Sequence, residues 1–95
     1  MARLKNNKYA QVPQAILDLH GFVLDEAQEE VKEFLAEAKN KNYRLVRIIT
    51  GKGISSINGR PILKPWLEGY LADRSYRWRL AKMNEGGDGA FDISL

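Results

Sequence analysis

The chain has 95 residues, a formal net charge of +3 at pH 7 and no cysteine. A chain of this length folds as one small domain, and the lack of cysteine excludes disulfides and thiolate metal sites. No apolar run approaches the roughly 18 residues of a membrane-spanning helix, and the basic start of the chain is followed by no apolar core of a signal peptide. We therefore expect a cytoplasmic protein without a membrane partner.

Positive charge is unevenly distributed along the chain. Residues 1–14 carry basic residues and no acid, whereas acidic residues crowd residues 25–37. Residues 38–67 again contain no acid and hold a run of basic residues: Lys39, Lys41, Arg44, Arg47, Lys52, Arg60 and Lys64. Such a field would concentrate polyanions near it. The alternative is a chance run on a solvated surface, and charge alone does not separate the two.

The polar, unpatterned residues 1–14 predict a flexible basic arm, and residues 15–95 predict one folded domain. The domain begins with a short, mostly apolar run at residues 15–19, which predicts a strand. Because side chains alternate along a strand, Asp18 and His20 share one face of it.

The clearest helix is predicted over residues 25–40. Its apolar residues recur at helical spacing and form one stripe: Ala27, Val31, Phe34, Leu35 and Ala38. The next apolar run, Leu45–Ile49, is too short for a helix and rich in β-branched residues, so it predicts a buried strand.

The second half of the chain predicts a loop, a helix and two strands. The loop runs from Thr50 to about Arg60 and turns at Asn58-Gly59. The helix covers residues 62–72 and must hold Pro65 in its first turn, where proline is tolerated. Two strands with alternating apolar residues are predicted next, at residues 76–80 and 90–95. A glycine-rich loop at residues 86–89 separates them.

This β-α-β-α-β-β order predicts the α/β class. We expect a two-layer sandwich in which a mixed four-stranded sheet carries two helices on one face, with the last two strands antiparallel. The other face would bear Asp18 and His20, with Arg77 and Arg79, and would be open to a ligand.

Two short motifs stand at the predicted strand ends. Leu17–Gly21 holds the only histidine of the chain beside Asp18, and Thr50–Gly53 reads Thr-Gly-Lys-Gly. An imidazole moves protons near neutral pH, while glycines let backbone N–H groups approach a phosphate. A site that acts on a phosphate is therefore indicated. Without further support, a strand-end hydrogen-bonding histidine and a tight turn are the commoner interpretations.

The motifs, in this order, resemble the Smr (small MutS-related) domain over about residues 16–95. The resemblance rests on Leu17–Gly21 and Thr50–Gly53, with support from Leu63-Lys64-Pro65 and residues 86–90. It implies a fold similar to the C-terminal domain of bacterial translation initiation factor three. It also implies nucleic-acid binding and, for several members, endonuclease activity on DNA or RNA, with some members tied to stalled ribosomes.

The resemblance implies roles for individual residues. Asp18 and His20 match the Asp-x-His pair implicated in cleavage. The nucleic-acid-binding candidates are the second motif and two nearby basic residues: Thr50, Gly51, Lys52, Gly53, Arg60 and Lys64. Many members have a histidine at the position of Thr50, and some have one at that of Ser55. Because His20 is the only histidine of this chain, a second catalytic imidazole is excluded here.

We therefore predict a monomeric endonuclease whose partner is DNA or RNA, with the ribosome as a further partner. No metal site and no cofactor are assigned. The 2′-hydroxyl of RNA is a built-in nucleophile, so a divalent cation, with Asp18 as its ligand, is expected only for DNA nicking. Two alternatives stay open: a non-catalytic module that binds nucleic acid or the ribosome, and an adaptor that binds a protein through the open sheet face.

Overall fold

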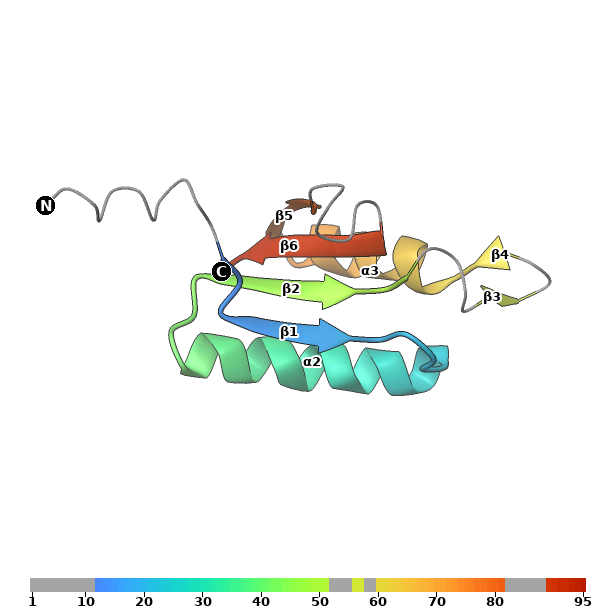
Figure 1. Cartoon of the computed structure of the whole chain (residues 1–95), viewed down its shortest axis with the longest axis horizontal. Helices are drawn as coiled ribbons and strands as arrows, with labels where there is room; N and C mark the ends of the chain where they lie inside the picture. The colour runs from blue at the N-terminus through green and yellow to red at the C-terminus, as the bar shows by residue number, and fades with distance from the viewer. Residues whose placement is uncertain (1–11, 52–55, 58–59, 82–88) are drawn as a thin grey trace, which may run out of the picture.

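The computed structural model describes residues 12–51, 56–57, 60–81 and 89–95 (Figure 1). The elements occur in the following order: β1 (Ala15–Asp18), α2 (Leu24–Asn40), β2 (Leu45–Ile49), β3 (Ser56–Ile57), β4 (Arg60–Pro61), α3 (Leu63–Asp73), β5 (Arg77–Leu80) and β6 (Ala90–Ser94). The predicted order of major strands and helices is confirmed. The predicted loop at residues 50–60 is wrong in part, because it includes β3 and β4, which pair antiparallel.

Four strands form one mixed sheet in the order β1-β2-β6-β5. Strand β1 runs parallel to β2, and β6 runs antiparallel to both β2 and β5. Strands β2 and β5 are therefore parallel, with α3 between them in the chain and β6 between them in the sheet. The predicted α/β class and the predicted antiparallel pairing of the last two strands are confirmed.

Both helices pack on the same face of the sheet. Strand residues on that face and apolar residues of both helices form one buried cluster: Leu19, Ala27, Val31, Leu35, Ala38, Val46, Ile48, Leu63, Leu67, Leu71, Phe91 and Ile93. Figure 1 shows α3 behind β2 and β6, and α2 along β1. Alternation along the strands therefore leaves the other sheet face without a helix from the described residues.

Each helix ends in the same backbone motif, which explains its length. After α2, Asn42 has a φ of 60° and donates its N–H to Lys39 O, while the N–H of Tyr43 reaches Ala38 O. After α3, Ser75 has a φ of 60° as well. This left-handed cap satisfies the last carbonyls of a helix and turns the chain sharply back toward the sheet.

Gln14, directly before β1, forms hydrogen bonds through its backbone and its side chain. Gln14 donates its N–H to Leu45 O at 2.8 Å, and its Oε1 accepts the N–H of Arg44 at 2.6 Å. The last residue of the predicted arm is thus bound to the start of β2. Residues 1–11 and the predicted turn at Asn58-Gly59 lie outside the described residues.

Candidate nucleic-acid interface

The two predicted motifs leave the sheet side by side, at the C-terminal ends of parallel neighbours. Asp18 is the partner of Ile49 in the register of β1 and β2. One step further, the N–H of Leu19 donates to Ile49 O at 2.8 Å. His20 therefore follows the end of β1 where Thr50 and Gly51 follow the end of β2, and the sheet brings the two motifs together.

A tight turn presents His20. The N–H of Phe22 donates to Leu19 O at 2.9 Å, and Gly21 has a φ of 86°. A residue with positive φ at the third position of such a turn matches type II, which favours glycine there. His20 occupies the corner, is exposed, and its ring makes no hydrogen bond with a described residue.

Asp18 contacts the backbone of His20. Its Oδ1 accepts the backbone N–H of His20 at 2.9 Å, a side-chain bond that shapes a turn two residues on. Both residues are exposed, as expected for the face that they share. The visible function of the Asp18 carboxylate is therefore to hold the turn that presents the imidazole.

Thr50 and Gly51 are held by a single carbonyl. The N–H groups of Thr50 and Gly51 donate to Gly89 O at 2.9 and 3.1 Å, and the Thr50 hydroxyl lies 3.3 Å from the same oxygen. Gly51 has a φ of 84°, which a glycine adopts without strain. In this arrangement the Gly51 amide is occupied within the protein, so the described part of the second motif acts as a scaffold.

Gly89 belongs to the candidate site, although the sequence analysis included it only in a supporting motif and gave it no role there. It stands directly before β6, whose first residue, Ala90, is the partner of Ile49. Its position could have indicated this place, because Gly89 is the last glycine of the glycine-rich segment and directly precedes a predicted strand.

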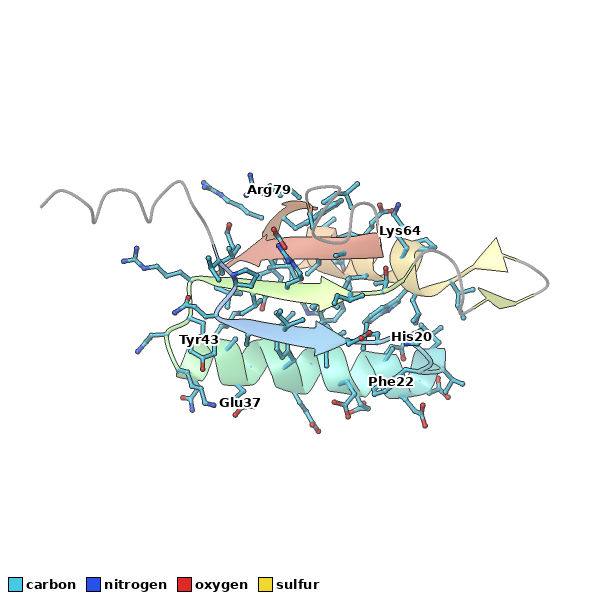
Figure 2. The ribbon with its side chains drawn as sticks, viewed as in Figure 1. His20, Phe22, Glu37, Tyr43, Lys64 and Arg79 are labelled. Carbon is cyan, nitrogen blue, oxygen red and sulfur yellow. The ribbon has the colours of Figure 1, made fainter. Side chains whose placement is uncertain are left out.

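The remaining predicted residues are placed only in part. Lys64 is the second residue of α3, is half-exposed, and lies at the same end of the molecule as His20 (Figure 2). Arg60 begins β4, but its side chain lies outside the described part of the chain, as do Lys52 and Gly53.

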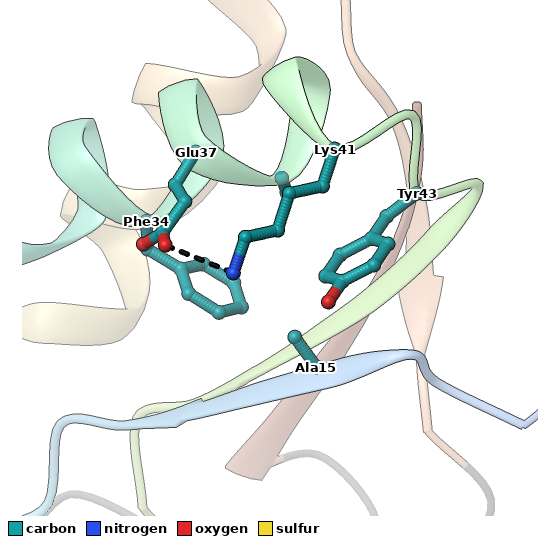
Figure 3. A pocket seen from close by; sticks show the side chains of 6 residues that line it. Ala15, Phe34, Glu37, Lys41 and Tyr43 are labelled. Carbon is teal, nitrogen blue, oxygen red and sulfur yellow. Dashed lines mark ion pairs between the residues drawn. The ribbon is translucent and has the colours of Figure 1, made fainter.

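A small cavity lies near Glu37 and Tyr43, at the end of the molecule opposite His20 (Figure 2), and Figure 3 shows it from close by. It measures about 100 Å³ and is lined by Ala15, Phe34, Glu37, Ala38, Lys41 and Tyr43. Lys41 Nζ lies 3.0 Å from Glu37 Oε2, and this hydrogen-bonded carboxylate raises the pKa of Lys41 above its ordinary 10.5. Figure 2 places Glu37 and Tyr43 far from His20, so this cavity is no part of the candidate site.

The described residues form neither a metal-binding cluster nor a membrane-spanning helix. No three histidine, aspartate or glutamate side chains there gather into a metal-binding group. Neither described helix combines the length and the apolar character needed to cross a membrane.

A family comparison covers most of the chain. The model of the Smr domain family matches residues 17–95. Among curated relatives, Endonuclease NBR9 of Saccharomyces cerevisiae is 36% identical over 70 residues, which are 74% of this chain and 29% of that protein. Endonuclease MutS2 of Carboxydothermus hydrogenoformans is 35% identical over 81 residues, 83% of this chain and 10% of that protein. The chain thus spans less than half the length of these relatives.

Solved structures share the fold. The stand-alone small MutS-related protein YdaL of Escherichia coli matches with a TM-score of 0.79 at 24% identity, over 100% of this chain and 76% of that one. The Smr domain of Thermus thermophilus MutS2 matches with a TM-score of 0.74 at 26% identity, over 85% of this chain and 96% of that one. Both likenesses agree with the mixed four-stranded sheet and two helices described above.

Proposed function

This chain belongs to the Smr domain family, and from that membership and the geometry of its strand ends we propose that it is a nucleic-acid-binding endonuclease. The observation that carries the proposal is the exposed His20 ring, free of hydrogen bonds to described residues, beside the Thr50-Gly51 scaffold. Two relatives that are named endonucleases support the proposal. The substrate is a sugar–phosphate backbone, RNA or DNA.

On RNA the proposed chemistry needs one proton-transfer group and one positive field. The His20 imidazole takes the proton from a 2′-hydroxyl, whose oxygen attacks phosphorus and expels the 5′-oxygen. The leaving oxygen then takes a proton from the imidazolium or from water. Lys64 and Lys52 stabilise the negative charge on the phosphate, and Asp18 fixes the backbone from which the imidazole extends.

A second function, nucleic-acid binding without cleavage, is favoured by one specific observation. The Asp18 carboxylate engages the backbone N–H of His20, and the imidazole has no carboxylate partner among the described residues. A histidine used only for binding needs no such partner, whereas many acid–base histidines are oriented by one.

His20→Ala separates the two functions. If His20 transfers the proton, the substitution lowers cleavage by about 10²- to 10⁴-fold, while binding changes little because only a small exposed group is lost. The measurement is cleavage of single-stranded RNA and nicking of plasmid DNA, each paired with a binding isotherm, on wild type and His20→Ala.

The matched control is Lys32→Gln, which alters an exposed side chain of α2 that pairs with Glu29 at 3.7 Å. It should cleave and bind like wild type. Equal cleavage by wild type and His20→Ala would contradict catalysis by His20. Tight binding with no cleavage by purified wild type would establish the binding module instead.

A further inference from the structure

One row of side chains crosses all four strands on the helix-free face of the sheet. The register pairs Ile16 with Arg47, Arg47 with Asp92, and Asp92 with Arg79. Directly opposed residues of neighbouring strands point to the same face. The row therefore runs from β1, which leads into the His20 turn, to β5 at the far edge of the sheet.

The middle of this row is a closed ion pair. Arg47 Nε lies 2.6 Å from Asp92 Oδ1, and Arg47 Nη2 lies 3.1 Å from Asp92 Oδ2. This two-pronged geometry is the strong form of the arginine–carboxylate interaction. Both oxygens of Asp92 are thus engaged by Arg47, although Arg79 stands directly opposite Asp92 on the other side.

Two guanidinium groups on β5 have no partner among the residues that the structure describes. Arg77 and Arg79 are exposed, and neither makes a hydrogen bond or ion pair with any described residue. Trp78 between them turns to the helix-covered face, where its ring centroid lies 5.0 Å from that of Phe91. The packing of Trp78 therefore aims both arginines at the helix-free face.

We infer that Arg77 and Arg79 bind the sugar–phosphate backbone of a single nucleic-acid strand that crosses the helix-free face toward His20. Residues two apart on a strand lie about 6.7 Å apart at Cα, close to the spacing of neighbouring phosphates in an extended strand. Arginines suit phosphate oxygens because their planar donors can bind two of them at once. This inference rests on the proposed function and assigns a second contact region to it.

The sheet register relates these arginines to the proposed cleavage site, because Arg79 and Ile16 lie in one row and β1 leads from Ile16 to His20. Three inter-strand steps of about 4.8 Å, roughly 14 Å in all, separate β5 from β1, and the four residues from Ile16 to His20 add up to about 13 Å along the chain. Ile16, with 55% of its surface exposed, lies in the same row and offers apolar contact to a sugar or base. The strand would therefore place the phosphates on Arg77 and Arg79 a few nucleotides from the phosphate at His20.

Salt dependence of binding tests the inference. The probe is a fluorescent single-stranded 2′-O-methyl RNA of about 12 nucleotides, which cannot be cut through its 2′-oxygens, titrated between about 50 and 300 mM NaCl. Each neutralised phosphate of a single strand contributes about 0.7 to the slope of log K against log salt. Arg77→Gln/Arg79→Gln should reduce the magnitude of that slope by about 1.4, and Arg77→Lys/Arg79→Lys should retain most of it.

The matched control removes the same charge from α2 and its C-cap residue. Lys32→Gln/Lys41→Gln replaces two exposed lysines that already pair with Glu29 and Glu37, and it should leave the slope at the wild-type value. Equal slopes for wild type and the Arg77→Gln/Arg79→Gln variant would overturn the inference and leave the proposed function standing. No binding by wild type would overturn both.

An acidic peptide is the competing occupant of this face. A poly-glutamate of equal charge, titrated alongside, should bind far more weakly than the oligonucleotide. Equal affinity for the two probes, with equal loss in the Arg77→Gln/Arg79→Gln variant, would make the face a site for acidic chains and overturn the inference.

Discussion

At the scale of single residues, two glycines shape the candidate site by their backbone alone. Gly21 and Gly51 have φ values of 86° and 84°, and a Cβ built on either meets no atom within 4 Å. Space is therefore available at both positions, and only the backbone conformation demands glycine. The sequence motifs contain these glycines because each chain segment must turn sharply as it leaves its strand.

Gly51→Ala should lower the free energy of unfolding by about 1 to 2 kcal/mol, the cost of a left-handed conformation for a residue with a Cβ. Gly69→Ala, within α3, is the matched control. It has ordinary helical φ and open space around its Cβ, so it should raise stability by roughly 0.5 to 1 kcal/mol. Urea unfolding of both variants measures the two changes in the free energy of unfolding. Equal effects of the two substitutions would refute a special need for glycine at position 51.

At the scale of elements, periodicity predicted most of what the structure contains. The stripe of α2 is buried at Ala27, Val31, Leu35 and Ala38, and Pro65 falls in the first turn of α3. The strands β3 and β4 have two residues each, too few for any alternation to show. The place of β6 between β2 and β5 is a matter of topology, which local patterns do not encode.

The candidate site was predictable to a similar extent. Motif spacing and the strand assignment brought His20 beside Thr50 and Gly51, as parallel neighbours require. Two contacts join segments that are far apart in the chain. Gly89 O accepts the N–H groups of Thr50 and Gly51, and Arg47 pairs with Asp92. Such contacts depend on the sheet order, so no local pattern could have indicated them.

Arg47→Met tests the ion pair that bridges β2 and β6. The side chains of Arg47 and Asp92 are only 10% and 6% exposed, so the substitution leaves a buried carboxylate without its partner. We expect a loss of about 3 to 5 kcal/mol in the free energy of unfolding. The double variant Arg47→Met/Asp92→Leu should recover much of that loss, as chemical denaturation would show. A double variant as unstable as the single one would contradict this account of the pair.

At the scale of the whole molecule, the two ends of the strands carry different features. The end with His20 and Lys64 carries the strand tips, whereas the end with Glu37 and Tyr43 carries the small cavity. The two described helices cover one face of the sheet, so we expect a long ligand to use the opposite face and the strand ends that carry His20. We expect nucleic acid to bind at the strand ends that carry His20 and Thr50.

Mapping by NMR tests that claim most directly. Backbone amide signals of the wild-type protein are followed while the 2′-O-methyl oligonucleotide is added. We predict that the largest shift changes fall on Leu19, His20, Gly21 and Gly89, with little change at Phe34 and Tyr43. Changes centred on Phe34 and Tyr43, with His20 and its neighbours unaffected, would contradict the account.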